Sequence, residues 1–514
     1  MFVKTYGFAV NGIEAYKITI EVNVVNGAYF NIVGLPDNAV KESQQRVFAA
    51  LKNIGLGIPV KGITINLAPA DIKKEGACYD LPIAVALLAG TGQLPHERIS
   101  EYLIMGELSL DGKIRPVRGI LPIVEKCLDE GLTKAILPEK NADEANIIRK
   151  VKVIGMPHLK DAIDYFNAKT SEIKYNTKVQ NDEGEEFNLV GGELPDFSDV
   201  KGQENIKRAL EIAAAGGHNA ILIGPPGSGK TMLSKRLPSI LPPMNIQEAL
   251  ETTKIHSVSG KLSIIKGLIR KRPFRNPHHT ISDIALVGGG SNPKPGEISL
   301  AHNGILFLDE LPEFKRSALE VMRQPMEERK VIISRSKFSV EFPANFMLIA
   351  SMNPCPCGFL NHPEKNCVCA PGSIAKYLNK ISGPLMDRID LHVEVCPVPI
   401  SSLSSKPSGE SSSDVLKRVL LAREIQQKRF SGNKSHGTNA NMKPSELSLY
   451  CALDETGKSL LETAMKKLKL SARAYERILK VSRTIADLDS SEKIMSNHLA
   501  EAIQYRSLDR ESWK

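Results

Sequence analysis

The sequence predicts a multidomain α/β protein whose C-terminal part is helical. One observation is an apolar run that ends in a glycine-rich loop, NAILIGPPGSGKT at 219–231, before a helical pattern. A second is a pair of apolar runs that end in polar residues, GILFLDE at 304–310 and FMLIASMN at 346–353. A third is the stretch from 414 onward, where amphipathic patterns carry few aromatics and no strand signal. Because 514 residues are too many for one core, we expect three or four units.

The composition is that of a globular protein in a reducing compartment. Hydrophobic residues make up 42% and charged residues 24%, and no window approaches about eighteen uninterrupted apolar residues, so no membrane span is expected. The start, MFVKTYGFAVNG, lacks the basic and apolar regions of an export signal, which favours a cytoplasmic protein. The eight cysteines are then core, reactive or metal-binding thiols rather than a disulfide framework.

The charge balance mildly favours an anionic partner. A net charge of +9 suits nucleic acid without requiring it. The basic run KGLIRKRPFR at 266–275 agrees with such a partner, although a solvated charged face is the commoner explanation of any single run. Charge alone therefore does not decide what the protein binds.

The first domain is predicted over residues 1–168 as an α/β unit. Residues 18–34 alternate apolar and polar positions around Asn26-Gly27, a dipeptide that suits a type I′ turn, and predict a β-hairpin. Further patterns follow in the order helix, strand, helix and strand, at 37–54, 61–69, 80–91 and 102–109. The rest of the chain divides by composition into a polar linker, an α/β core, a serine-rich mobile connection with a helix, and a helical domain, at 169–194, 195–398, 399–440 and 441–514.

The glycine-rich loop has the spacing G-x-x-x-x-G-K-T of a phosphate-binding loop. Its glycines let backbone N–H groups turn toward phosphate oxygens, and they are Gly224, Gly227 and Gly229. Lys230 can reach the β and γ phosphates, and the Thr231 hydroxyl can bind Mg²⁺. The alternative is a chance glycine-rich turn, which the apolar run before it and the helical pattern after it disfavour. We expect an ATP and Mg²⁺ site.

Polar residues at the ends of later apolar runs supply what hydrolysis needs. Asp309 is the expected partner of Mg²⁺, and Glu310 is the expected water-activating carboxylate. Asn353 ends the next apolar run, where its amide can bind the attacking water or the γ-phosphate. Arg388, in SGPLMDRIDLHVEV, carries a planar, permanently charged guanidinium that fits the oxygens of a transferred phosphoryl group.

The order of these motifs resembles the AAA+ ATPases, and within them the magnesium-chelatase-like branch. FRNPHHTISDIALVGGG at 274–290 and SARAYERILKVSRTIADL at 471–488 narrow the resemblance to the YifB/ComM family, over nearly the full chain. The resemblance implies that Asn353 is sensor 1, Arg388 the arginine finger, and Arg473 the sensor 2 arginine on a helical lid. It also implies a homo-oligomeric ring, expected to be a hexamer, in which the finger acts on a neighbour's nucleotide.

Two further segments resemble family features that usually face a ring pore. VIISRSKFSVEFP at 331–343 resembles an extra β-hairpin before sensor 1, and the long interval from Lys230 to Asp309 leaves room for an insert. His278 and His279 could be metal ligands, but adjacent side chains rarely point the same way, so a pore or interface contact is preferred.

Parts of the first domain resemble the protease domain of Lon. EGACYDLPIAVALLAGTG at 75–92 and MGELSLDGKIRPVRGIL at 105–121 carry this resemblance, which places Cys78 at the nucleophile and Leu121 at the lysine. The catalytic dyad is therefore lost, and an inactive domain is expected. In GKIRPVRG, the basic residues Lys113, Arg115 and Arg118 could contact phosphate, or they simply face solvent.

Four cysteines lie close together in the sequence, as C-x-C-x9-C-x-C. The thiolates of Cys355, Cys357, Cys367 and Cys369 could close a tetrahedral zinc site. The alternative is a loop with surface thiols. A metal here would fix the long connection between Asn353 and Arg388.

Together these observations predict a ring-forming, Mg²⁺-dependent ATPase that acts on DNA, similar to the ComM branch-migration helicases. The ATPase prediction depends on residues, whereas the DNA prediction depends mainly on resemblance and charge. Two alternatives are a chelatase-type motor and a protein-remodelling motor; Lon-type proteolysis is the weakest.

Overall fold

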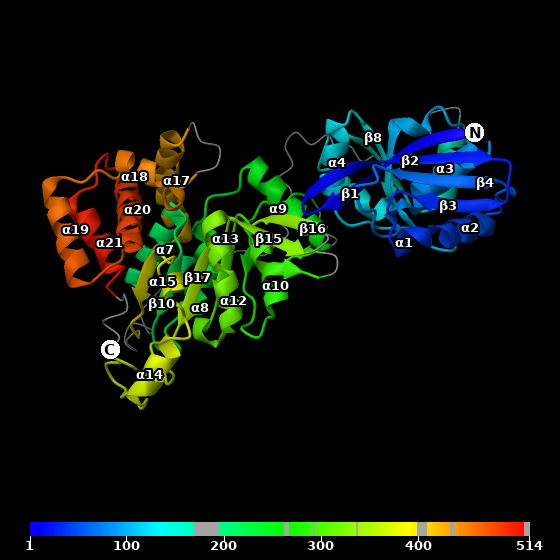
Figure 1. The fold of residues 1–514 in the computed structure, drawn as a ribbon. Helices are drawn as coiled ribbons and strands as arrows, with labels where there is room; N and C mark the ends of the chain where they lie inside the picture. The colour runs from blue at the N-terminus through cyan, green and yellow to red at the C-terminus, as the bar shows by residue number, and fades with distance from the viewer. Residues whose placement is uncertain are drawn as a thin grey trace. The chain divides into compact units, whose positions relative to one another are not determined.

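The computed structural model describes residues 1–168, 195–261, 267–290, 293–335, 338–397, 409–431 and 437–507. The described residues form two compact units (Figure 1): those of Met1–Val190 and Ala249–Ile269 form the first, and those of Gly191–Glu248 and Arg270–Lys514 form the second. The predicted linker at 169–194 lies outside the described residues, as do 399–408 of the serine-rich connection. Among the helices of the described ranges, none is both long and apolar enough to cross a membrane.

The first unit contains a mixed seven-stranded sheet with the strand order β3-β4-β2-β1-β5-β8-β9. Apolar side chains of β2 at Ile18, Ile20 and Val22 are fully buried because they alternate onto the core face. The strands are β1 (Phe2–Asn11), β2 (Glu14–Val25), β3 (Tyr29–Val33), β4 (Gly62–Ala68), β5 (Tyr102–Ile104), β8 (Lys134–Pro138) and β9 (Lys152–Met156). The short strands β6 (Glu107–Leu108) and β7 (Ile114–Arg115) pair separately.

The predicted β-hairpin at 18–34 is wrong. β2 and β3 are both strands, but β4 lies between them, antiparallel to β2 and parallel to β3. The hairpin is formed one strand earlier, where β1 and β2 pair from Phe2↔Asn23 to Asn11↔Glu14. Gly12, with φ 66°, makes the turn at a second Asn-Gly dipeptide.

Helices cover this sheet, and one of them is entirely buried. Every residue of α3, DLPIAVALLAG, is buried, which explains why it is apolar on all sides. The α-helices are α1 (Asn38–Lys41), α2 (Ser43–Asn53), α3 (Asp80–Gly90), α4 (Ile120–Asp129), α5 (Ala142–Ala145) and α6 (Leu159–Asn167). Single 3₁₀ turns are η1 (Ala77–Tyr79), η2 (Ile99–Glu101) and η3 (Glu139–Asn141).

The second unit is built on a five-stranded parallel sheet with the strand order β11-β14-β17-β10-β18. The register pairs Ile223 with Met352 and Leu308 with Ala350, so β10, β14 and β17 end at the same edge of the sheet. The strands are β10 (Ala220–Ile223), β11 (Phe274–Arg275), β14 (Ile305–Leu308), β17 (Met347–Met352) and β18 (Leu391–Glu394). The three central strands are buried along their whole length, as expected for a parallel sheet.

Helices and two antiparallel ladders complete the second unit. Its helices before residue 400 are α7 (Glu204–Gly216), α8 (Lys230–Arg236), α10 (Asp283–Val287), α11 (Glu297–Leu300), α12 (Arg316–Val321), α13 (Arg323–Glu328), α14 (Pro371–Leu378) and α15 (Gly383–Met386). The 3₁₀ turns are η4 (Phe197–Asp199), η5 (Leu237–Ile240), η7 (Leu311–Glu313) and η8 (Asn439–Asn441). The ladders are β12 (Gly288–Gly289) with β13 (Lys294–Pro295) and β15 (Lys330–Arg335) with β16 (Phe338–Pro343). The β15–β16 ladder confirms the predicted hairpin at 331–343.

The C-terminal helices share one hydrophobic core with the parallel sheet. The core joins Leu222 of β10, Ile212 of α7 and Ile485 of α20. In Figure 1 these helices, in orange and red, lie beside α7 and β10. They are α17 (Ser412–Arg429), α18 (Pro444–Tyr450), α19 (Glu455–Lys467), α20 (Ala472–Leu488) and α21 (Ser496–Gln504).

Not all residues of the predicted α/β core at 195–398 belong to the second unit. α9 (Ile246–Ser259) continues from the second unit into the residues of the first. Within the first unit, Lys254 pairs with Glu125 and the Ser257 hydroxyl donates to Glu144. Part of the insert expected between Lys230 and Asp309 is therefore bound to the N-terminal unit.

Candidate nucleotide and metal sites

The glycine-rich loop joins the end of β10 to α8. Gly227 and Gly229 have φ of 76° and 87°, a region that side chains disfavour. A Cβ added at either glycine would meet nothing within 4 Å, so the backbone of the loop is open to an approaching phosphate. Gly224 has a different role: a Cβ there would lie 2.4 Å from the Val395 carbonyl oxygen. These positions fit a polyphosphate ligand.

The Lys230 ammonium contacts the backbone at the start of this loop. It donates to the carbonyl oxygens of Gly224 at 2.7 Å and Pro225 at 2.8 Å, and to Asn353 Oδ1 at 3.3 Å. Burial lowers the pKa of Lys230 to about 8. The lysine of the loop and the amide that ends β17 therefore meet, although 123 positions separate them in the chain.

A second contact brings the loop to the end of β14. The Thr231 hydroxyl donates to Asp309 Oδ2 at 2.7 Å, and the Ser351 hydroxyl donates to Asp309 Oδ1. A hydroxyl and a carboxylate oxygen are ligands that Mg²⁺ prefers, so these two side chains fit the predicted metal partners. Ser351, which orients the carboxylate, was not predicted; its position at the end of an apolar run was the available signal.

Glu310 follows Asp309 with a left-handed backbone, at φ 53°. This conformation is uncommon for a residue with a side chain and is held by the Glu310 N–H, which lies 3.1 Å from Asp309 Oδ1. The Glu310 side chain is 60% exposed, and His279 Nδ1 lies 3.7 Å from its Oε2. The sequence predicted only a pore or interface contact for His279, whereas the structure places it beside the proposed water-activating group.

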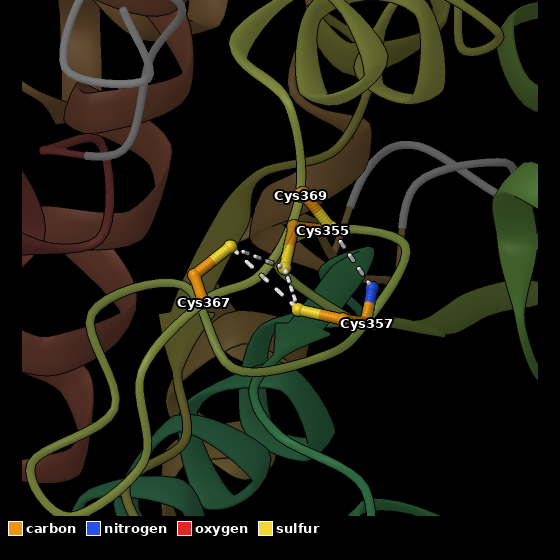
Figure 2. A group of neighbouring side chains, drawn as sticks. All are labelled: Cys355, Cys357, Cys367 and Cys369. Atoms are coloured by element: carbon orange, nitrogen blue, oxygen red, sulfur yellow. Dashed lines mark hydrogen bonds between the residues drawn. The ribbon is translucent and has the colours of Figure 1, made fainter.

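Figure 2 shows the four predicted cysteines converging from two passes of the loop between β17 and α14. The Sγ atom of Cys355 lies 3.4 Å from that of Cys357 and 3.7 Å from that of Cys367, and Cys357 and Cys367 are 3.6 Å apart. All four Sγ atoms lie within 4.8 Å of one another. A regular tetrahedron with metal–sulfur bonds of about 2.3 Å has edges of about 3.8 Å, so the group fits a single tetrahedral ion.

Hydrogen bonds already favour thiolate at one of these cysteines. The Phe359 backbone N–H is the main cause that lowers the pKa of Cys357 to about 6. The backbone N–H of Cys357 in turn donates to Cys369 Sγ at 3.3 Å. A thiolate is the form in which cysteine binds zinc.

Comparison with known proteins decides the family. The chain matches the family model described as magnesium chelatase, subunit ChlI, over residues 196–403, and related models of subunit ChlI over 20–141 and 409–506. It is 43% identical over 508 residues to the competence protein ComM of Haemophilus influenzae, covering 98% of this chain and 97% of that protein. It is 44% identical over 505 residues to the uncharacterized protein YifB of Escherichia coli, covering 97% and 96%. The chain belongs to the ComM/YifB family of magnesium-chelatase-like proteins.

Membership of the ComM/YifB family supports an AAA+ ATPase motor, with ATP and Mg²⁺ as the expected ligands. A partial match extends to Lon protease 2 of Bacillus subtilis, at 27% identity over 189 residues, which covers 31% of this chain and 33% of that protein. This match shows Lon-like similarity over part of the chain.

The two predicted arginines are not in hydrogen-bond contact with the glycine-rich loop in the described part of this ComM/YifB chain. Arg388 is 9% exposed; its Nη1 donates to the Pro384 carbonyl at 2.6 Å, and its Nη2 pairs with Glu327 at 2.7 Å. Arg473 is exposed on the first turn of α20. One turn later, the partly exposed Arg477 pairs at 2.9 Å with the buried Asp390, an ion pair that the sequence did not predict.

The first unit does not assemble the catalytic dyad of Lon. Burial raises the pKa of Cys78 to about 12, so its thiol is protonated near neutral pH. Leu121 is fully buried in α4. The exposed Lys113 pairs with Asp111 at 3.1 Å, and Arg115 pairs with Glu107 at 3.2 Å. Arg118 lies near Gly260, where an added Cβ would be 2.9 Å from its Nε.

Proposed function

We propose that this protein is a Mg²⁺-dependent ATPase motor that acts on DNA as a homo-oligomeric ring, with a hexamer as the expected form. The observation that carries the ATPase is the meeting of three strand ends: Lys230 contacts Asn353 at 3.3 Å, and Thr231 contacts Asp309 at 2.7 Å. When bound, Mg²⁺ neutralises phosphate charge. Thr231 and Asp309 would hold the ion, while Lys230 binds the β and γ phosphates.

In this proposal, Glu310 accepts a proton from the attacking water and Asn353 orients that water or the γ-phosphate. The exposure of the Glu310 side chain, 60%, leaves it accessible to water in the isolated chain. Arg388 acts on the nucleotide of a neighbouring subunit, and Arg473 acts as the sensor of nucleotide on the helical lid.

DNA is the proposed substrate because its phosphates suit a chain of net charge +9, and because the relative from Haemophilus influenzae is named a competence protein. We place the protein in the cytoplasm, where DNA and ATP are available and thiols stay reduced. A chelatase-type or protein-remodelling motor is the competing proposal, since the matching family models are named for magnesium chelatase.

Steady-state ATP hydrolysis, measured with and without single-stranded and forked DNA at two salt concentrations, tests this proposal. We expect DNA to stimulate hydrolysis and the stimulation to fall with salt, because phosphate contacts release counterions. An intact ring whose rate no DNA changes would contradict the choice of substrate and redirect the search to protein partners.

The Glu310→Gln variant serves as the blank and tests the catalytic assignment. We expect it to bind ATP and to lose at least about a hundredfold in turnover, because removal of a general base costs that much. The matched control is Glu313→Gln, three residues on, whose carboxylate pairs with Lys380 at 3.3 Å. Normal turnover in Glu310→Gln would overturn the role of Glu310.

We further infer that the four cysteines hold one structural zinc ion. The edges of 3.4–3.7 Å among the Sγ atoms of three cysteines support a single ion. Elemental analysis of purified protein should find one zinc per chain, and Cys357→Ser should lose it. Cys396→Ser, which changes an exposed cysteine outside the cluster, should keep it. Metal-free wild-type protein with full ATPase activity would reject the zinc site.

Peptidase activity is not proposed. The raised pKa of Cys78 and the burial of Leu121 leave the first unit without an activated nucleophile or a neighbouring base at the positions of the Lon dyad.

A further inference from the structure

The cysteine loop touches the glycine-rich loop directly, at Gly358. Gly358 follows Cys357 with φ 84°, and its N–H donates to the Cys355 carbonyl at 3.0 Å. A Cβ added at Gly358 would lie 2.6 Å from Cδ and 3.2 Å from Cγ of Pro226. Only glycine therefore fits here, because both the backbone conformation and the approach to the proline exclude a side chain.

A second connection runs from the cluster to Asn353. Cys355, which is fully buried, follows Asn353 by two residues, so the position of its sulfur limits where the Asn353 side chain can lie. Asn353 also lines one pocket with Tyr377 of α14, the helix that begins directly after Cys369 and Ala370, and its backbone N–H acts to lower the pKa of the Tyr377 hydroxyl against the larger effect of burial. Both ends of the cysteine loop are thus fixed around the residue that contacts Lys230.

We propose that zinc at the four cysteines and nucleotide at the glycine-rich loop bind cooperatively, through the contact of Gly358 with Pro226 and the position of Asn353. The proposal rests on the zinc and ATP sites proposed above and adds a regulation of the ATP site. The sign of the coupling, in which each ligand strengthens binding of the other, follows from the conformational freedom of the cysteine loop. Between β17 and α14 the described chain forms no helix or strand, so a single ion bound by four side chains removes much of the freedom of this connection.

Without the ion, Pro226 loses a fixed neighbour and Asn353 loses its anchor, so nucleotide must order both when it binds. The zinc-loaded form therefore binds nucleotide more tightly. Because coupling between two sites is reciprocal, bound nucleotide must equally strengthen the binding of zinc.

The contact can be altered without removing any cysteine. Gly358→Ala introduces a Cβ that Pro226 must avoid, while all four thiols remain. The matched control is Gly372→Ala, in the first turn of α14, where an added Cβ would meet nothing within 4 Å. Both variants are made in the Glu310→Gln background, so that binding of a fluorescent ATP analogue is measured without turnover.

We expect Gly358→Ala to retain one zinc per chain and to bind the analogue at least fivefold more weakly than Gly372→Ala. Removal of zinc from the parent protein with a chelator should weaken binding of the analogue to a similar extent. Adding zinc back should restore the affinity. Conversely, saturating analogue should slow the transfer of zinc to a colorimetric chelator, a readout that does not depend on activity.

Equal analogue affinity in Gly358→Ala and Gly372→Ala, or in loaded and metal-free parent, would overturn the coupling while leaving the nucleotide site intact. Failure of the parent protein to bind the analogue would instead overturn the proposed nucleotide site. The two failures are therefore distinguishable.

Discussion

At the scale of single residues, buried charge is concentrated where the C-terminal helices meet the parallel sheet. Asp390 is 1% exposed, and its pKa is held well below the usual range by Arg477 against the opposing effect of burial. Asn219, directly before β10, joins β17 to the segment before β18: its side chain accepts from Leu348 N–H at 2.8 Å and donates to the Arg388 carbonyl at 3.3 Å. A buried polar network of this kind fixes one geometry, because each unpaired group would be costly.

His392 in this region makes the stability of the second unit dependent on pH. Its Nε2 lies 3.3 Å from Arg506 Nη1, and burial, followed by the Arg506 charge, lowers the pKa of His392 well below the usual range, although Asp390 opposes this. The native imidazole therefore stays neutral, whereas in the unfolded chain it takes up a proton below about pH 6.5. Its contribution to stability is present above that pH and is lost as the pH falls.

We expect wild type to lose about 1.4 kcal/mol more unfolding free energy than His392→Gln between pH 7.5 and 5.5, since glutamine keeps an acceptor but does not titrate. Denaturant unfolding followed by circular dichroism measures the difference. His278→Gln, at an exposed histidine, is the control and should behave as wild type. Parallel pH dependence in wild type and His392→Gln would contradict the neutral state of His392.

The residues of the proposed nucleotide site could be named from the sequence, because each lies in a short motif with its own chemistry. Gly227, Lys230 and Thr231 share one loop, and Asp309 ends an apolar run. The contacts of His279 with Glu310 and of Arg477 with Asp390 were not predictable, because each joins segments whose approach depends on the packing of the whole unit. Likewise, the burial of Arg388 against Glu327 follows from tertiary structure rather than from its motif.

At the scale of elements, the prediction failed where two strands had the same signal. Asn11-Gly12 and Asn26-Gly27 both suit a tight turn, but only the first joins adjacent strands. β4 takes the place beside β2 that β3 would have occupied, and local sequence does not encode that choice between partners. The hairpin of β15 and β16 was predictable because it was recognised from the family rather than from its turn.

The base of the β15–β16 hairpin is tied to the C-terminal helices by Arg329. This half-buried residue has a left-handed backbone, φ 58°, and desolvation lowers its pKa to about 10. Its guanidinium donates to the Phe346 carbonyl at 2.9 Å and to Asn441 Oδ1 of η8 at 2.8 Å. An unusual backbone and a partly buried charge are both costly, so the two hydrogen bonds of Arg329 are expected to hold this geometry.

Asn441→Ala should therefore loosen the hairpin. Loss of the acceptor leaves a partly buried guanidinium N–H without this partner, which costs about 1 kcal/mol, and amides of residues 330–343 should exchange faster with deuterium. Asn497→Ala, at an exposed position of α21, should leave this exchange unchanged. Equal protection of the hairpin in both variants would show that Arg329 does not hold its base through Asn441.

At the scale of the whole molecule, the chain passes from the second unit to the first and back. The described residues of 249–269 belong to the N-terminal unit, although the described residues on both sides belong to the unit that contains the proposed nucleotide site. The composition of the sequence predicted a linear series of domains and contained no signal for this return, since the contacts of Lys254 and Ser257 with the first unit are long-range. Sequence similarity to ComM over 98% of the chain covers both units together.

The proposed ring makes one further demand, that Arg388 completes the nucleotide site of a neighbour. In the single chain its guanidinium is paired with Glu327 at 2.7 Å, so assembly must exchange this partner for a phosphate or bring the nucleotide to it.

Arg388→Ala and Lys230→Met should each be nearly inactive alone. If Arg388 acts between subunits, a 1:1 mixture should regain about a quarter of the wild-type rate, because half of the subunits keep Lys230 and half of their neighbours keep Arg388. A mixture of Lys230→Met with Glu310→Gln is the control, since both groups serve the same subunit and no recovery is expected. Recovery in neither mixture, although subunits exchange, would assign Arg388 to its own chain, where the Glu327 pair would be its permanent role.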